Sequence, residues 1–140
     1  MKKIVFVCLG NICRSPMAEF VMKSLTDQLK IESRATSSWE HGNPIHQGTQ
    51  AIFKKYAIAY DRNKTSQQIS VADFADFNYV IGMDESNVRD LKRMAPEDFQ
   101  HKIYQFEEES VPDPWYTGDF DQTYDLVLAG CKKWLERLDG

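Results

Sequence analysis

The hydrophobic pattern begins with an uninterrupted apolar run, Ile-Val-Phe-Val at residues 4–7. A continuous β-branched run of this kind is typical of a strand buried on both faces of a parallel sheet, so we expect it in the sheet interior. A second apolar run predicts a strand over residues 79–83. Weaker patterns predict strands over residues 33–38 and 102–106.

Between these runs the apolar residues recur at helical spacing. Such residues follow the first strand between Met17 and Leu29, with Ser15 placed as an N-cap and Pro16 as the first helical residue. Ser70 and Asp73 have the spacing of a capping box at the start of a short helix. The other predicted helices cover residues 47–57, 70–77, 86–94 and 124–138.

This alternation of strands and helices predicts an α/β fold with a doubly wound sheet. In such sheets, binding sites form beyond the carboxyl ends of the strands, which is where Cys8 lies. The chain has 140 residues and neither repeats nor a linker, so we expect one domain over residues 1–140. Residues 107–120 predict an irregular acidic loop whose length suggests a functional role.

The segment between the first strand and the first helix is a candidate phosphate-binding loop. Five residues separate Cys8 from Arg14, and a loop that ends at a helix N-terminus can direct backbone N–H groups and the helix dipole at an oxyanion. Gly10 and Asn11 tolerate the backbone conformations that such a curl needs. The guanidinium of Arg14 can bind two phosphoryl oxygens. The expected phosphate-binding residues are Leu9, Gly10, Asn11, Ile12, Cys13 and Arg14.

Cys8 is the candidate nucleophile of this loop. The amide dipoles and Arg14 favour its thiolate over its thiol, and a thiolate could attack phosphorus to give a phosphocysteine. Ser15 can hydrogen-bond the Cys8 sulfur and assist its departure in a second step. The alternative is a buried Cys at a strand end, and we consider it much the weaker interpretation because strand, loop, Arg and helix occur together.

A second segment offers a proton donor. Asp113 stands between two prolines, and Trp115 and Tyr116 could form walls for a flat aromatic group or could simply pack half-buried. The three glutamates at residues 107–109 could disfavour a further negative charge on Asp113, but we expect them to form a solvated face.

Composition excludes several classes of protein. The net charge of −4 without a basic stripe argues against a nucleic-acid binder. Three Cys and three His without ligand spacing argue against a metal site. The longest apolar runs are far shorter than the roughly 20 residues of a membrane helix. We therefore expect a cytoplasmic protein with reduced thiols, no metal and no cofactor.

The chain resembles the low-molecular-weight protein tyrosine phosphatases in two motifs, VCLGNICRSP at residues 7–16 and DPWY at residues 113–116. The likeness extends to GNP at 42–44, DF at 73–74, MDESN at 83–87 and DL at 90–91. It implies a sheet of four parallel strands flanked by helices, phosphotyrosine-containing protein substrates and, where one exists, an opposing tyrosine kinase. It also implies a phosphocysteine on Cys8, phosphate held by Arg14, Asp113 as general acid and no metal.

The same resemblance assigns supporting roles. It implies that Asn11 holds the loop through contacts that include Ser33, and that Trp39, Trp115 and Tyr116 border the substrate cleft. Tyr116 matches a tyrosine phosphorylated in some members, although Trp115 replaces the neighbouring Tyr found in many. Lys64 stands where a supporting His is expected, which suggests a Lys64–Asp84 pair. Cys13 could close a reversible disulfide with Cys8 or only pack beneath the loop.

Three other functions remain as alternatives. A phosphoarginine phosphatase of the same fold would carry Thr where this chain has Ile12. An arsenate reductase would need further cysteines on a mobile loop, whereas Cys131 is expected to pack in the core from the apolar face of the last helix. A phosphocarrier or plain anion-binding module would have no use for Arg14 and Asp113 together.

Overall fold

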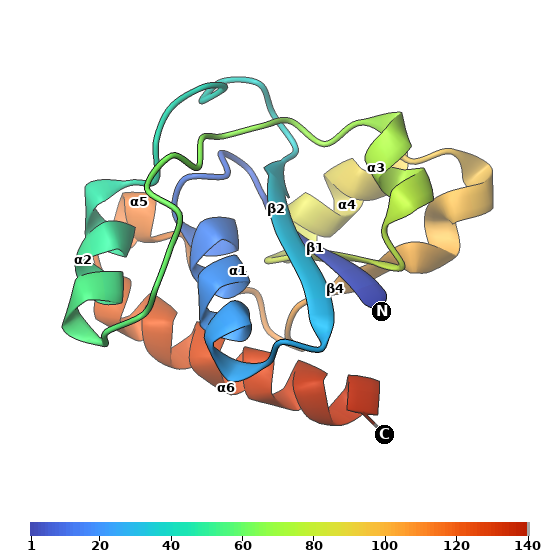
Figure 1. Cartoon of the computed structure of the whole chain (residues 1–140). Helices are drawn as coiled ribbons and strands as arrows, with labels where there is room; N and C mark the ends of the chain where they lie inside the picture. The colour runs from blue at the N-terminus through green and yellow to red at the C-terminus, as the bar shows by residue number, and fades with distance from the viewer. Residues whose placement is uncertain (140) are drawn as a thin grey trace.

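A four-stranded parallel sheet forms the centre of the molecule, which is described over residues 1–139 by a computed structural model (Figure 1). The strands run in the order β2-β1-β3-β4, so the first strand lies in the interior of the sheet as expected. In register, Ile4 of β1 faces Ile31 on one side and Tyr79 on the other. The strands are β1 (Lys2–Cys8), β2 (Leu29–Ala35), β3 (Tyr79–Gly82) and β4 (Ile103–Gln105). The predicted α/β class and the four parallel strands are confirmed.

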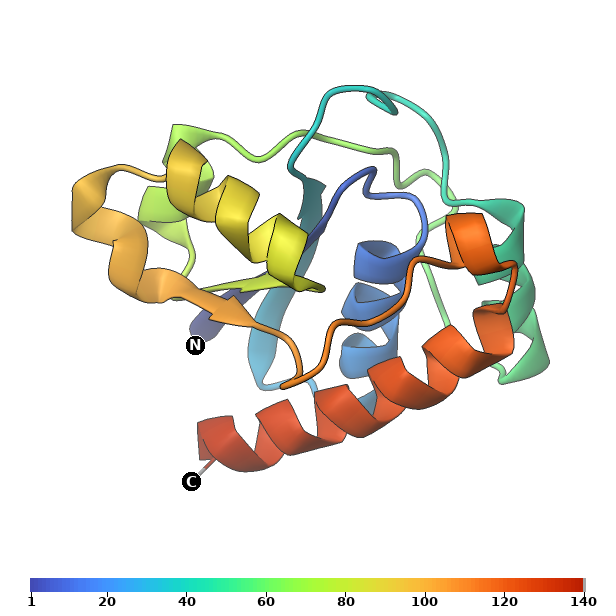
Figure 2. The ribbon, with the colours of Figure 1, turned by 180° about the vertical axis from the view of Figure 1, so that it is seen from behind.

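Alternate side chains of β1 divide the core into two layers. Ile4, Phe6 and Cys8 face the layer formed by α1 (Arg14–Leu25), α2 (Gln47–Lys55) and α6 (Phe120–Asp139). Val5 and Val7 face the opposite layer, formed by α3 (Val71–Asp76), α4 (Glu85–Met94) and the 3₁₀ helix η1 (Glu97–Lys102). Figure 2 shows α6 running along the lower edge of the molecule from behind. Burial on both faces explains the unbroken apolar run of this strand.

The second strand lies earlier in the chain than its pattern predicted. It covers Leu29–Ala35 rather than residues 33–38, and Leu29 opens this strand instead of closing the preceding helix, which ends at Leu25. The buried positions of β2 alternate through Ile31, Ser33 and Ala35. Because two of these three are small or polar, the strand carries little hydrophobic signal of its own.

Most of the remaining elements agree with their patterns, but η1 was not predicted, α6 begins at Phe120 instead of residue 124, and the acidic segment before it is not wholly irregular. The capping box of Ser70 and Asp73 is present at the start of α3. Residues 107–120 contain a single helical turn, α5 (Pro114–Thr117), where only irregular structure was predicted. Its signal was present in the sequence, because Asp113 occupies the N-cap and Pro114 the first helical position.

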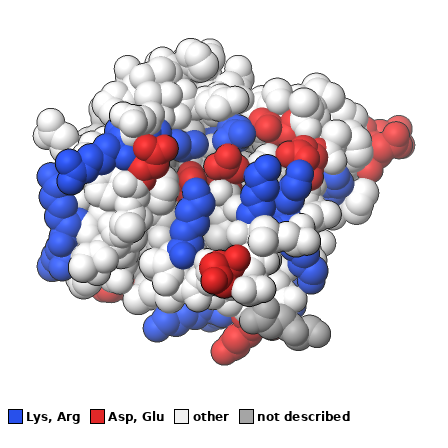
Figure 3. All heavy atoms as spheres, in the orientation of Figure 1, with Lys and Arg blue, Asp and Glu red and all other residues white. Residues whose placement is uncertain are grey.

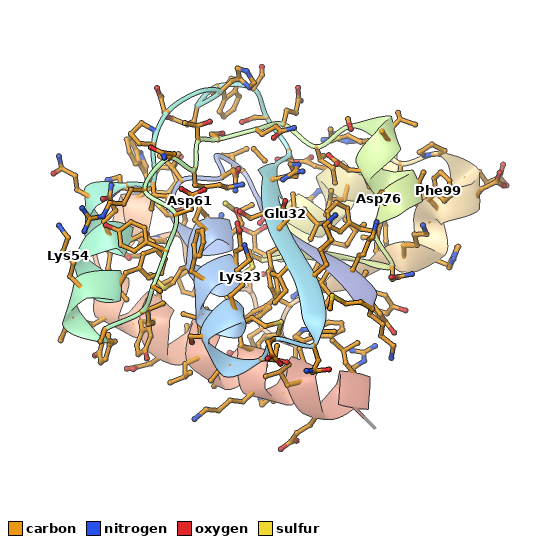
Figure 4. The ribbon with its side chains drawn as sticks, viewed as in Figure 1. Lys23, Glu32, Lys54, Asp61, Asp76 and Phe99 are labelled. Atoms are coloured by element: carbon orange, nitrogen blue, oxygen red, sulfur yellow. The ribbon has the colours of Figure 1, made fainter. Side chains whose placement is uncertain are left out.

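The surface carries mixed charge. On the face of Figure 3, lysines and arginines are interspersed with aspartates and glutamates rather than gathered in one basic stripe. Figure 4 shows the side chains of the same face, with Lys23 on α1 and Lys54 extending from α2 into solvent. Among residues 1–139, no helix combines the length and apolarity needed to cross a membrane.

Candidate active site

A hollow opens at the carboxyl end of β1. It brings together nearly all of the predicted site residues from three separate segments of the chain. Asn11 and Ser15 lie outside its lining, buried on the inner side of the loop. Glu40 borders the hollow and was not predicted. The lining consists of Cys8, Leu9, Gly10, Ile12, Cys13, Arg14, Trp39, Glu40, Asp113, Trp115 and Tyr116.

The carbonyl groups of the loop point away from this hollow. The oxygens of Cys8 and Leu9 accept hydrogen bonds from Thr36 and Ser37, which follow β2. The carbonyl oxygens of Gly10, Ile12 and Cys13 accept hydrogen bonds from the Ser66 hydroxyl, the His46 backbone N–H and the Thr49 hydroxyl. When carbonyls of successive peptides are held outward, the N–H groups are left on the inner side of the curl. A loop with this arrangement of N–H groups is able to bind an anion on its concave side.

Two polar groups lie within hydrogen-bonding distance of the Cys8 sulfur. The backbone N–H of Asn11 lies 3.2 Å from Sγ, and the hydroxyl oxygen of Ser15 lies 3.1 Å from it. The predicted contact between Ser15 and Cys8 is therefore confirmed. The prediction that Ser15 caps the helix is wrong, because α1 begins at Arg14 with Cys13 at the N-cap and no side chain caps it. The hydroxyl of Ser15 is committed to the loop, and the first turn of α1 is left open toward the anion site.

A buried polar network holds the loop from below. Asn11 adopts a left-handed backbone conformation with φ of 55°, and its side-chain amide donates to the hydroxyls of Ser15 at 2.8 Å and Ser33 at 3.0 Å. The hydroxyl of Ser33 donates in turn to the buried carboxylate of Glu19 at 2.6 Å. The expected contact between Asn11 and Ser33 is confirmed. Glu19 was not predicted, although a carboxylate within the buried stretch of α1 was a signal.

Lys64 belongs to this network and not to the pair that the sequence suggested. Its Nζ donates to the Ser33 carbonyl at 2.9 Å and lies 3.7 Å from the Glu19 carboxylate. The expected Lys64–Asp84 pair is wrong, because Asp84 binds Arg14 instead. Burial lowers the pKa of Lys64, against the opposing effect of Glu19.

Arg14 is clamped by acceptors from the segments after β3 and β4. Its Nη1 donates to Asp84 at 2.6 Å and to the Val111 carbonyl at 2.9 Å, and its Nη2 lies 3.4 Å from Asp113. Burial alone would lower the pKa of Arg14, but negative charge at Cys8, Asp84 and Asp113 outweighs burial and raises it. A charged guanidinium is therefore fixed close to Cys8.

Asp113 lies across the hollow at the N-cap of α5. One carboxylate oxygen accepts the backbone N–H of Trp115 at 3.0 Å, and the other faces Arg14. The neighbouring Glu107 turns away from this region and pairs with Lys133 of α6 at 3.2 Å. The backbone therefore aims the Asp113 carboxyl at the same space as the Arg14 guanidinium.

Three aromatic side chains stand at the rim of the hollow. Trp39 and Tyr116 are each 78% exposed and Trp115 is 56% exposed. This much exposure excludes ordinary core packing for the two tryptophans and the tyrosine. The rim offers flat apolar surfaces to a ligand whose charged end reaches the loop.

The three cysteines occupy different surroundings, and all are free thiols. Cys13 lines the same hollow as Cys8, and burial, followed by the negative charge of Cys8, strongly raises its pKa. Cys131 is fully buried in α6 with its Sγ 3.7 Å from the Ala18 carbonyl, which confirms the predicted core position. Within the described residues, no three His, Cys, Asp or Glu side chains cluster as metal ligands would.

Comparison with known proteins gives one family over nearly the whole chain. Residues 3–140 match the model of the low molecular weight phosphotyrosine protein phosphatases. The low molecular weight protein-tyrosine-phosphatase PtpA of Staphylococcus aureus is 44% identical over 141 residues, covering 94% of this chain and 90% of that protein.

Two solved structures are informative. The low molecular weight protein tyrosine phosphatase SP-PTP from Streptococcus pyogenes is 62% identical with a TM-score of 0.97, covering 99% of this chain and 93% of that one. A drosophila arginine phosphatase is 30% identical with a TM-score of 0.89, covering 100% of this chain and 99% of that one.

Proposed function

The chain belongs to the low molecular weight protein tyrosine phosphatase family, and on that premise we propose that it hydrolyses phosphotyrosine through a phosphocysteine on Cys8. The observation that carries the proposal is the position of Cys8 in one hollow with Arg14, Asp113 and three aromatic rim residues. The proposal covers residues 1–140 as one catalytic domain that uses no metal.

In the first step the loop binds the phosphoryl group. The N–H groups of residues 9–14 and the guanidinium of Arg14 surround the three non-bridging oxygens, and the Cys8 thiolate attacks phosphorus from the loop side. The S–P bond forms as the P–O bond to the tyrosyl oxygen breaks. Charge that spreads over the equatorial oxygens meets donors that are already in place.

Asp113 supplies the proton for the departing tyrosyl oxygen. A bound phosphate dianion competes for Arg14 and disfavours a second negative charge beside it, which favours the protonated carboxyl. After transfer, the Asp113 carboxylate takes a proton from water as that water attacks the phosphocysteine. The S–P bond then breaks, and the Ser15 hydroxyl donates to the leaving Cys8 sulfur.

The aromatic rim favours phosphotyrosine over phosphoarginine. Trp39, Trp115 and Tyr116 present flat surfaces at the level that a phenyl ring would occupy above the loop. Ile12 lines the floor of the hollow and places an apolar side chain there. The similarity to an arginine phosphatase makes phosphoarginine the second candidate and sets the comparison that the experiment must include.

Cys13 provides a route for reversible inactivation. Hydrogen peroxide would oxidise the Cys8 thiolate to a sulfenic acid with release of hydroxide. The Cys13 thiol would then attack that sulfur to form the S–S bond, and its proton would leave with the sulfenic hydroxyl group as water. Burial, followed by the negative charge of Cys8, raises the pKa of Cys13 and favours Cys8 as the thiolate that attacks phosphorus. Oxidation of Cys8 to the sulfenic acid removes that negative charge before Cys13 attacks. We assign the protein to the cytoplasm, where reducing conditions return both residues to thiols.

The test is phosphate release from a phosphotyrosine peptide and from phosphoarginine, measured in parallel with excess chelator and reductant. The proposal expects release from phosphotyrosine, and Cys8→Ser should abolish it while inorganic phosphate still binds. Preference for phosphoarginine would overturn the substrate class. Release that persists in Cys8→Ser would overturn the mechanism.

A further inference from the structure

His46 contacts both the phosphate loop and the two helices that follow Asp113, which are α5 and α6. Its ring stacks on Phe120, the first residue of α6, with centroids 5.1 Å apart and an interplanar angle of 17°. The ring meets Trp115 of α5 edge to face, at 5.5 Å and 80°. Its backbone N–H donates to the Ile12 carbonyl of the loop at 2.8 Å. No motif in the sequence drew attention to this residue.

A hydrogen bond to Nδ1 also holds the His46 ring in place. Residue 46 is the N-cap of α2, and its Nδ1 accepts the backbone N–H of Gly48 at 2.9 Å. Because Nδ1 accepts this hydrogen bond, the ring proton lies on Nε2. The side chain therefore combines an N-cap, which Asn could replace, with an aromatic surface, which Asn could not.

Gly48 leaves the space that the stacked rings of His46 and Phe120 need. A Cβ at this position would lie 2.4 Å from Cζ of Phe120, a separation that real side chains do not tolerate. Only glycine leaves room for the Phe120 ring against the N-terminal end of α2. In this position the Phe120 ring stacks on one face of the His46 ring. Figures 1 and 2 both show α5 beside this end of α2.

We propose that His46 is a positioning residue that holds the Trp115 wall at the correct distance from the phosphate loop and so selects aryl phosphates. Trp115 is more than half exposed, and its ring meets that of His46 on the α2 side. Because the backbone of His46 is hydrogen-bonded to the Ile12 carbonyl and its ring contacts Trp115, the distance between the phosphate loop and the Trp115 ring is fixed through His46. This inference rests on the proposed function, because it assumes that the slot receives a phenyl ring.

The test separates the two properties of the side chain. His46→Asn keeps a capping side chain and removes the ring, whereas His46→Phe keeps a ring and removes the cap. We expect His46→Asn to raise the KM for a phosphotyrosine peptide by about 3- to 10-fold, the range that corresponds to the loss of one aromatic pair, with kcat little changed. His46→Phe should lower the melting temperature and keep the KM close to that of the wild type.

Inhibition by inorganic phosphate is the internal control, because phosphate reaches the loop but not the walls. Its inhibition constant should be unchanged in His46→Asn. A parallel rise in that constant and in the KM would show a general disturbance of the loop and would overturn the inference. An unchanged KM in His46→Asn would overturn it as well.

A readout independent of turnover keeps this inference distinct from the proposed function. In a ¹H–¹⁵N spectrum, the indole resonance of Trp115, identified through Trp115→Phe, should shift in His46→Asn and move much less in His46→Phe. A wild-type protein that releases no phosphate would refute the proposed function. An indole resonance that stays in place in His46→Asn would refute the inference about His46.

Discussion

Replacing Asp84 should most directly separate Arg14, which binds phosphate in our proposal, from its anchor in the rest of the protein. One of its oxygens binds the Arg14 Nη1 at 2.6 Å, and the other accepts the backbone N–H of Asn87 at 2.6 Å and caps α4. Asp84→Ala removes both contacts. Asp84→Asn keeps an oxygen for the cap and a neutral partner for Arg14 but removes the charge.

The magnitude follows from burial. The Arg14 side chain is 3% exposed and that of Asp84 is 20% exposed, so the pair is mostly shielded from water. Breaking such a pair destabilises a protein by about 3 kcal/mol at the lower end of the known range, which applies here because Val111 and Asp113 still contact Arg14. The lost cap adds about 1 kcal/mol. We therefore expect about 4 kcal/mol for Asp84→Ala and about 2 kcal/mol for Asp84→Asn.

The assay combines urea unfolding, followed by circular dichroism, with the KM for a phosphotyrosine peptide. Both variants should raise the KM, because a guanidinium released from its anchor binds phosphate with less precision. Asp90→Asn is the matched control, since Asp90 lies on the same helix and pairs with the exposed Arg93. We expect it to change stability by less than about 0.5 kcal/mol. If Asp84→Ala matched this control in both stability and KM, the anchoring role of Asp84 would be refuted.

Three further predictions concern the acid, the second thiol and the buried network. Asp113→Asn should slow turnover of phenyl phosphate by about 10²–10⁴-fold but that of p-nitrophenyl phosphate much less, and equal losses would remove Asp113 from the acid role. Cys13→Ala should recover less activity than the wild type when thiol is added after peroxide, and equal recovery would exclude protection by Cys13. Lys64→Ala should lower stability by about 1–3 kcal/mol and reduce turnover, because Lys64 supports Ser33 and Glu19 beneath the loop; unchanged melting temperature and turnover would contradict this.

The parts of the fold that the sequence predicted are those with strong local signals. The apolar run of β1, the capping box at Ser70 and the strand-loop-helix around Cys8 and Arg14 each depend on neighbours close in the chain. The start of β2 was misplaced because Leu29 also fits the helical spacing of the residues before it, so the segment from Leu29 to Glu32 was not assigned to a strand. The polar Ser33, which accepts a hydrogen bond from Asn11, occupies a buried position of this strand and weakens its alternating apolar pattern.

The contacts that complete the site could not be predicted because they join distant segments. Arg14 and Asp84 are 70 positions apart, and nothing in either local pattern indicates the pair. Lys64 illustrates the same limit, because the sequence shows a lysine in place of a supporting histidine but not which carboxylate it faces. His46 likewise becomes visible only where its ring meets Trp115 and Phe120.

The most direct test of the central claim is to trap the intermediate. The enzyme is mixed with a phosphotyrosine substrate, quenched rapidly in acid and digested, and the peptide that contains Cys8 is examined by mass spectrometry. We predict that this peptide gains one phosphoryl group during turnover and that neither Cys13 nor Cys131 is modified. Rapid turnover with an unmodified Cys8 peptide, together with activity that survives Cys8→Ser, would contradict the account.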